Sequence, residues 1–180
     1  MKTRSLLKVA AALALMTGSS LFAQAISSGS TDVTLNGTVQ ETLTISLDQT
    51  AISFVLVPGS ATNAGNTSVN VTTTWNLLSG RNAVALYAYF DNPISALANG
   101  SSAIPSANVS ATVGGSSVGS FTNVVPFGTG VTLMSQSITS ANLSGVKTST
   151  VSLNIDLSSF STLPAGTYSG TLHFQAQATP

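Results

Sequence analysis

The sequence has no cysteine, one histidine and one tryptophan, and only ten of its 180 residues are Lys, Arg, Asp or Glu. Without cysteine the chain can form no disulfide and carry no cysteine-linked lipid anchor, so its core and β ladders must hold the fold. Five cations, three of them within the first eight residues, cannot neutralise a phosphate backbone, which excludes a nucleic-acid-binding protein.

Residues 1–25 are predicted to be a secretory signal peptide. Three cations precede a short apolar run at residues 9–16, and small residues lead to a cleavage point after Ala25. The run is much shorter than the ~20 residues that span a bilayer. We therefore expect a protein exported to the periplasm, the cell surface or the extracellular space, with no transmembrane segment after cleavage.

Cleavage would leave few charges on the mature chain. Two cations against five acids give a net charge of −3, and the surface must be covered mainly by Ser, Thr, Asn and Gln. The remaining charged residues are Arg81 and Lys147, with Asp32, Glu41, Asp48, Asp91 and Asp156.

Period-two alternation of apolar and polar residues is the dominant pattern and predicts half-buried strands. Two nearly continuous apolar runs, residues 51–57 and 83–90, predict central strands covered on both faces. Gly114-Gly115 predicts a two-residue hairpin turn. The alternating or mostly apolar segments are residues 68–76, 109–113, 116–124, 130–138, 148–157 and 166–178.

Turn residues separate these strands, and no amphipathic helix of ten residues follows residue 25. The stretches 59–67 and 92–107 are predicted to be loops. The sequence thus predicts an all-β fold, an antiparallel two-sheet β-sandwich of 8–10 strands. A single domain is expected over residues 38–180, preceded by a flexible arm or first strand at residues 26–37.

Residues 32–47 keep one face apolar for sixteen residues, which would reach ~53 Å as a single strand, whereas strands usually span ~17–20 Å. Either this strand bends between the two sheets near Gly37 or Glu41, or residues 31–39 form an arm and residues 42–47 form the first strand of the sandwich. A third possibility is disorder before residue 38, as is common at termini.

Asp32-Val33-Thr34, Asn36-Gly37 and Val39 make an alternating segment that resembles the donor-strand extension of fimbrial subunits assembled by the chaperone–usher route. Residues 163–168, Leu-Pro-Ala-Gly-Thr-Tyr, are similar to the approach to the last strand in fimbrial subunits and spore-coat-U-like proteins.

The resemblance implies an immunoglobulin-like sandwich that assembles by β-strand addition with copies of itself or with other β-sandwich subunits. The strand-donor candidates are Val33, Leu35, Gly37 and Val39. The competing interpretation is that residues 32–47 are ordinary first strands of a self-contained domain.

No constellation of residues predicts catalysis, a cofactor or a metal. Period two places His173 on a polar face, where we expect an exposed histidine without a catalytic partner. No serine sits in a Gly-x-Ser-x-Gly elbow between a strand and a helix, and no Asp-x-Asp calcium loop occurs. We therefore expect a non-enzymatic structural or interaction protein.

The aromatic residues allow an alternative function. Trp75 is in phase with Val69 and Val71, so it is expected in the core. Tyr87 and Tyr89, next to Asp91, are the candidate contacts of an extracellular carbohydrate-binding module, the second interpretation of this chain.

Overall fold

The computed structural model describes residues 28–122 and 130–180, so the predicted signal peptide lies outside the described residues. Residues 38–180 form one compact unit, and residues 28–37 belong to a separate one. The described chain contains eleven strands and one short 3-10 helix, which confirms the all-β prediction. Eight of these strands have five or more residues. The elements are β1 (Thr42–Leu47), β2 (Asn63–Ala64), β3 (Val69–Asn76), β4 (Ala83–Tyr89), β5 (Leu97–Asn99), β6 (Ser102–Ile104), η1 (Ser106–Asn108), β7 (Val109–Val113), β8 (Ser116–Ser120), β9 (Val131–Ser137), β10 (Ser144–Ile155) and β11 (His173–Thr179).

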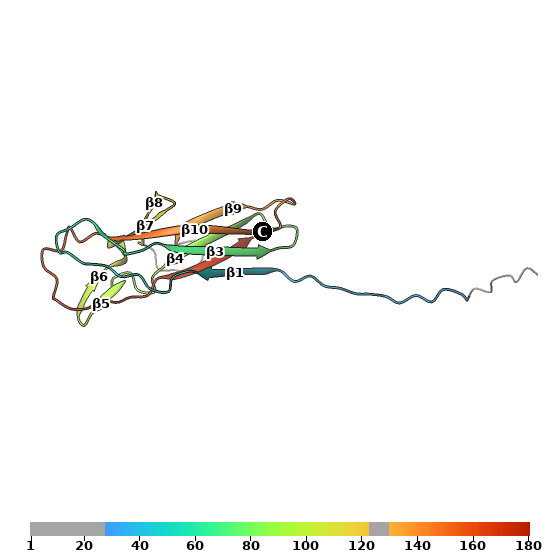
Figure 1. Cartoon of the computed structure of the whole chain (residues 1–180), viewed down its shortest axis with the longest axis horizontal. Coiled ribbons are helices and arrows are strands. Elements are labelled where there is room, and N and C mark those ends of the chain that lie inside the picture. The colour runs from blue at the N-terminus through green and yellow to red at the C-terminus, as the bar shows by residue number, and fades with distance from the viewer. Residues whose placement is uncertain (1–27, 123–129) are drawn as a thin grey trace, which may run out of the picture. The chain divides into compact units, whose positions relative to one another are not determined.

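The strands form two antiparallel sheets and one small hairpin (Figure 1). The large sheet has the order β1-β3-β10-β7-β8, and β2 pairs with one end of β10. The small sheet has the order β11-β4-β9, and β5 pairs with β6. The two sheets make the predicted sandwich, whereas its immunoglobulin-like character stays a prediction.

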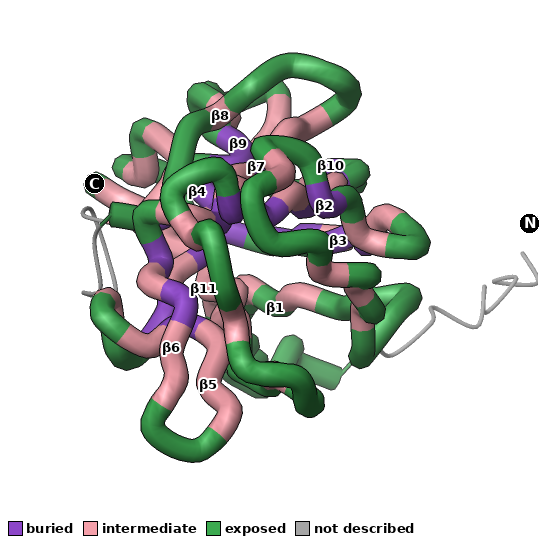
Figure 2. The backbone as a smooth tube through the Cα atoms, turned by 90° about the vertical axis from the view of Figure 1, so that its left-hand side faces the viewer, coloured by how far each residue is buried: buried purple, intermediate pink, exposed green. Residues whose placement is uncertain are grey.

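The core lies between the two sheets and follows from the alternation in the sequence. Val71 and Trp75 of β3 and Val151 of β10 are buried on the inner face of the large sheet. Val84 and Leu86 of β4 are fully buried on the inner face of the small sheet. The buried segments gather around β3 and β4 in Figure 2. The prediction that Trp75 packs in the core is confirmed.

β4 is the central strand of the small sheet, as its apolar run predicted, with β11 on one side and β9 on the other. The pairing with β9 shifts between Leu86 and Tyr87, where an extra residue of β9 has no partner. This bulge explains why the consecutive residues Leu133 and Met134 are both buried.

The Gly114-Gly115 hairpin is confirmed, because both glycines have positive φ angles, 56° and 87°, between β7 and β8. Three other predictions were wrong. Neither predicted loop is a simple loop, since residues 59–67 contain β2 and residues 92–107 contain β5, β6 and most of η1. The last strand begins at His173 and not near residue 166.

The third error concerns residues 51–57, which are not a central strand. They make a single β-bridge, between Phe54 and Gly65, and the side chains of Val55 and Val57 are 83% and 52% exposed. A run of apolar residues predicted two covered faces, but only one face of this segment is covered.

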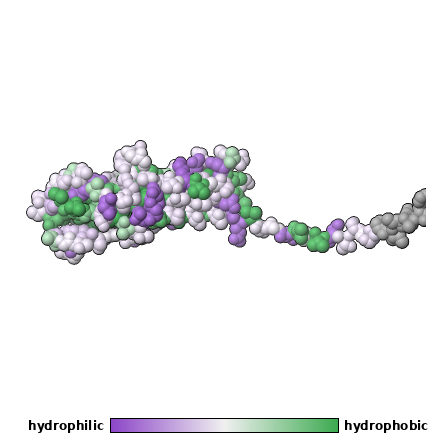
Figure 3. Space-filling model, viewed as in Figure 1, coloured by the Kyte–Doolittle hydropathy of each residue, from purple (hydrophilic) through white to green (hydrophobic). Residues whose placement is uncertain are grey.

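The surface is mainly neutral, as the scarcity of charge predicted. Figure 3 shows most of the visible face in pale colours, with hydrophobic residues gathered at the end of the sandwich where β5 and β6 lie. Because charges on edge strands normally block unwanted pairing, this surface leaves its strand edges little protected.

Replacing Gly145 with alanine is expected to destabilise the domain by about 1–3 kcal/mol, the usual cost of overpacking a core. Gly145 lies opposite Trp75, and an added methyl group would come within 2.5 Å of Cζ2 of the indole. Urea denaturation followed by Trp75 fluorescence measures the effect. Gly29→Ala is the control, because no atom lies within 4 Å of a methyl group there. Equal unfolding free energies for the two variants would contradict the packing argument.

Candidate functional site

Residues 38–180 contain a cavity of about 890 Å³ between two segments that lie mostly outside the sheets. Residues 49–58 form one wall, and residues 163–174 form the other. Its floor comes from the inner faces of the sandwich. The floor residues are Val69, Phe90, Leu97, Val109, Leu153 and Ile155.

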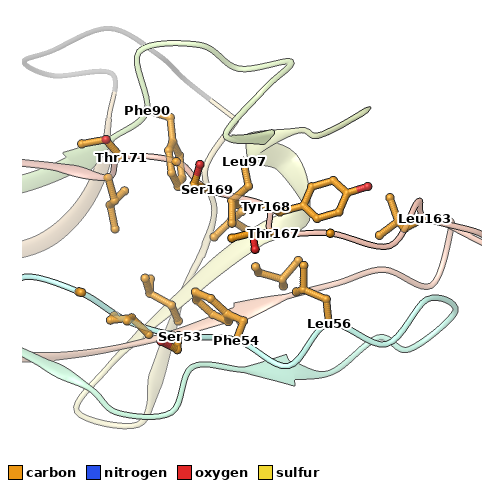
Figure 4. A pocket seen from close by; sticks show the side chains of 18 of the residues that line it. Ser53, Phe54, Leu56, Phe90, Leu97, Leu163, Thr167, Tyr168, Ser169 and Thr171 are labelled. Carbon is orange, nitrogen blue, oxygen red and sulfur yellow. The ribbon is translucent and has the colours of Figure 1, made fainter. Parts of the chain in front are cut away.

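The first wall is strand-like and turns its apolar face to the cavity. Ile52, Phe54 and Leu56 are half-buried and line the cavity, while the residues between them face solvent. Figure 4 shows the side chains of Phe54 and Leu56 on this side and those of Thr167 and Tyr168 across from them.

Among the described residues, the backbone of the first wall is hydrogen-bonded along one edge only. The Ser53 N–H donates to the side chain of Asn66 at 2.9 Å, and the Asn66 N–H donates back to the Ser53 carbonyl at 2.9 Å. The Val57 N–H donates to the side chain of Asn63 at 2.7 Å. Since backbone groups alternate in direction along a strand, those of Phe54 and its inward-facing neighbours point to the opposite edge.

The second wall is held against the β5 hairpin through its main chain. Ser169 exchanges two backbone hydrogen bonds with Ala98, at 2.9 and 3.0 Å. Gly170 permits this approach, because a Cβ atom there would collide with the carbonyl oxygen of Ala96. The Tyr168 hydroxyl donates to the Pro164 carbonyl at 3.2 Å and fixes the turn before the wall.

β1 and β11 lie next to each other at the edges of different sheets (Figure 2). Within the described residues, β1 pairs with β3 alone and β11 pairs with β4 alone. All seven residues of β11 are half-buried. A second cavity of about 290 Å³ lies between β1 and the end of β11. We call these two cavities, together with the segments 41–58 and 163–178 that border them, the open seam.

An ion pair lies at the β1 end of the open seam. Arg81 binds the carboxylate of Glu41 with two hydrogen bonds, Nε to Oε1 at 3.0 Å and Nη2 to Oε2 at 2.7 Å. The Leu78 N–H donates to Oε1 at 2.9 Å. These bonds, that from Arg81 first, lower the pKa of Glu41 from its ordinary value of 4.5 to about 2. The pair fixes the residue that directly precedes β1.

The strand-donor candidates lie outside every sheet of the described chain. β1 begins at Thr42, and residues 28–40 are all exposed and form no strand. Val33, Leu35 and Val39 are 80%, 89% and 68% exposed, and no atom lies within 4 Å of a Cβ added at Gly37. In the described chain these side chains are therefore accessible to another molecule.

The carbohydrate candidates lie on the outer face of the small sheet. Tyr89 stacks on His173, with ring centroids 5.1 Å apart and an interplanar angle of 21°, so one face of its ring is covered. Nε2 of His173 lies 2.9 Å from Oδ2 of Asp91, but off the line that a hydrogen bond requires. His173 is therefore half-buried and has neighbours, contrary to our expectation of an exposed residue. Tyr87 pairs with Gln175 across the strands. The sugar site stays a prediction.

Sequence patterns missed the open seam. The alternation of Ile52, Phe54 and Leu56 was present, but it was obscured by Val55 and Val57, which made the run look apolar on both faces. The pattern could not reveal that no strand packs against this apolar face among the described residues, because periodicity shows only which face of a segment is apolar.

No helix among the described residues is long and apolar enough to cross a membrane. Over the same residues, no three His, Cys, Asp or Glu side chains are grouped so that they could hold a metal ion. No protein-family model matches this chain, and no curated protein matches it.

Glu41→Gln is expected to abolish part of the acid sensitivity of the fold. A carboxyl group whose pKa is depressed in the folded state stabilises that state above its unfolded pKa, and loses this contribution as it is protonated. The contribution of Glu41 should therefore be complete above pH 4.5 and disappear between pH 4.5 and about 2. Melting temperatures of both proteins from pH 2 to 7 should differ most above pH 4.5 and converge near pH 2. A difference that does not depend on pH would contradict the ion-pair assignment.

Proposed function

We propose that this protein is an exported structural or interaction protein of the cell envelope or extracellular space, and that it assembles by β-strand addition. The open seam carries the proposal. It combines strand edges that are unpaired among the described residues with an apolar cavity beside them, and these are the two requirements for binding an extended segment.

The occupant we propose is residues 31–39 of a second copy of this chain. An extended segment of nine residues measures ~30 Å, enough to run the ~23 Å length of the seven-residue β11 and reach the cavity beside it. Val33, Leu35 and Val39 share one face and are exposed, which suits alternate insertion into an apolar groove. Asp32 is the only charge in the segment, so burial costs little electrostatic free energy.

Main-chain hydrogen bonds would supply the affinity. The backbone groups of Phe54 and of β11 that face the seam are available to an incoming strand, which would then join the two sheets. The side chains of Ile52, Phe54 and Leu56 would determine which segments fit. In fimbrial subunits, an immunoglobulin-like sandwich is completed by a strand from the neighbouring subunit. We extend that arrangement to this chain.

The donor segment is tested by moving one charge along it. Leu35→Asp should dissociate the oligomers of the mature protein, because a buried Leu contributes about 2 kcal/mol and its loss weakens binding at least ~30-fold. Asn36→Asp carries the same charge one residue along, on the other face, and should leave assembly unchanged. Light scattering after size-exclusion chromatography measures the mass. Two variants of equal mass would refute insertion of that face.

The acceptor is tested with a synthetic peptide of residues 31–39. The peptide should bind the monomeric Leu35→Asp chain, and adding Leu56→Asp should reduce that binding at least ~30-fold, since Leu56 lines the cavity. Val55→Asp, at a side chain that is 83% exposed, is the matched control and should bind the peptide normally. Fluorescence anisotropy of the labelled peptide gives the Kd, and circular dichroism verifies the fold. If no peptide binds to the parent chain, the strand-addition proposal fails.

A further inference from the structure

We infer that Asn36-Gly37 and Glu41 exclude a chain's own arm, residues 28–40, from its own open seam, so that the seam is left for another copy. This inference rests on the proposed function and identifies what makes it intermolecular. An arm that leads into β1 can reach the seam by folding back along β1 as a hairpin.

Asn-Gly is the strongest short-range signal for a two-residue hairpin turn. A turn at Asn36-Gly37 would place Leu35 opposite Thr38, and by the same count it would place residue 28 opposite Ile45. The wall of the larger cavity begins only at Gln49. A chain's own arm therefore cannot fill the larger cavity, whichever way its side chains point.

The same turn would also present the wrong face. Residues opposite each other in an antiparallel pair point to the same side of the sheet, so Leu35 and Val33 would share the side of Thr38 and Gln40. On β1 that is the side of Thr42 and the exposed polar residues, whereas Leu43 and Ile45 point inward. The apolar face of the arm would lie in solvent, because a slip of one residue reverses every side chain.

Glu41 adds a third obstacle. In this hairpin Asp32 would lie directly opposite Glu41, and like charges at opposed positions destabilise a pair of strands. The carboxylate of Glu41 cannot easily turn away, since Arg81 and the Leu78 N–H hold it with three hydrogen bonds. An arm from another chain has no such link to β1 and is free to choose its register.

Inserting residues after Gly37 tests the inference. One added serine lets the Asn-Gly turn place Val33 opposite Val39, so that the apolar faces match; two added serines restore the mismatch. The mature protein with one insertion should lose oligomers, and amide hydrogen exchange at residues 31–36 should slow at least ~tenfold in its monomer. The protein with two insertions should assemble and exchange like the parent. Glu41→Gln should change exchange little in the single insertion, because the new register places Asp32 opposite Gln40; in the parent chain the same substitution removes the charge opposite Asp32 and should slow exchange.

Equal behaviour of the one- and two-residue insertions would overturn the inference, since arm length alone would then explain the result. Hydrogen exchange in dilute monomer also separates this test from that of the proposed function. If the parent protein forms no oligomer and binds no arm peptide, strand addition between copies fails. Slower exchange in the single insertion alone would still show that the register of the Asn-Gly turn keeps the arm from pairing with its own β1. If exchange does not slow, the inference fails.

Discussion

The unpaired main-chain groups along β1 and β11 are the constraint on which the rest of the structure depends. Each of these strands pairs on one side only among the described residues, and they belong to different sheets. Backbone N–H and C=O groups that are denied water must find partners, so an edge beside an apolar cavity is a costly arrangement if it stays empty. The two walls leave that edge accessible, because their backbone hydrogen bonds are made with segments on the side away from the cavity. Ser53 bonds with Asn66, and Ser169 bonds with Ala98.

The scarcity of charge acts on the same edges. Many sandwiches protect edge strands with lysine or with inward-pointing charges, which make pairing unfavourable. In this protein the one bidentate ion pair of the described residues, Glu41 with Arg81, lies where the arm meets β1. Its position divides an otherwise continuous apolar face into two parts with different surroundings, an exposed arm and a half-buried strand. On a surface with so few charges, this one ion pair therefore has a larger influence on strand pairing than it would have on a highly charged surface.

The sequence predicted strands correctly where the apolar face of a segment is buried in the core. Residues 68–76 and 148–157 predicted β3 and most of β10, and Trp75 was placed in the core. The sequence-based prediction was wrong at residues 51–57, where composition suggested a covered strand. It was also wrong at His173, because the neighbours of that side chain, Tyr89 and Asp91, come from β4 and from the residues just after it. Local patterns encode which face is apolar. They do not encode whether anything covers that face, so the candidate donor residues could be proposed from sequence but the seam could not.

The contact between Gly170 and the Ala96 carbonyl fixes the position of one wall of the seam. On that side the position of the wall is set by two main chains in direct contact, with no side chain between them that substitution could shorten or lengthen. Selection can therefore adjust the shape of the cavity mostly from the opposite side, through Ile52, Phe54 and Leu56. One wall acts as a fixed reference surface and the other as the adjustable one, so differences in partner preference among related chains should be concentrated in that short segment.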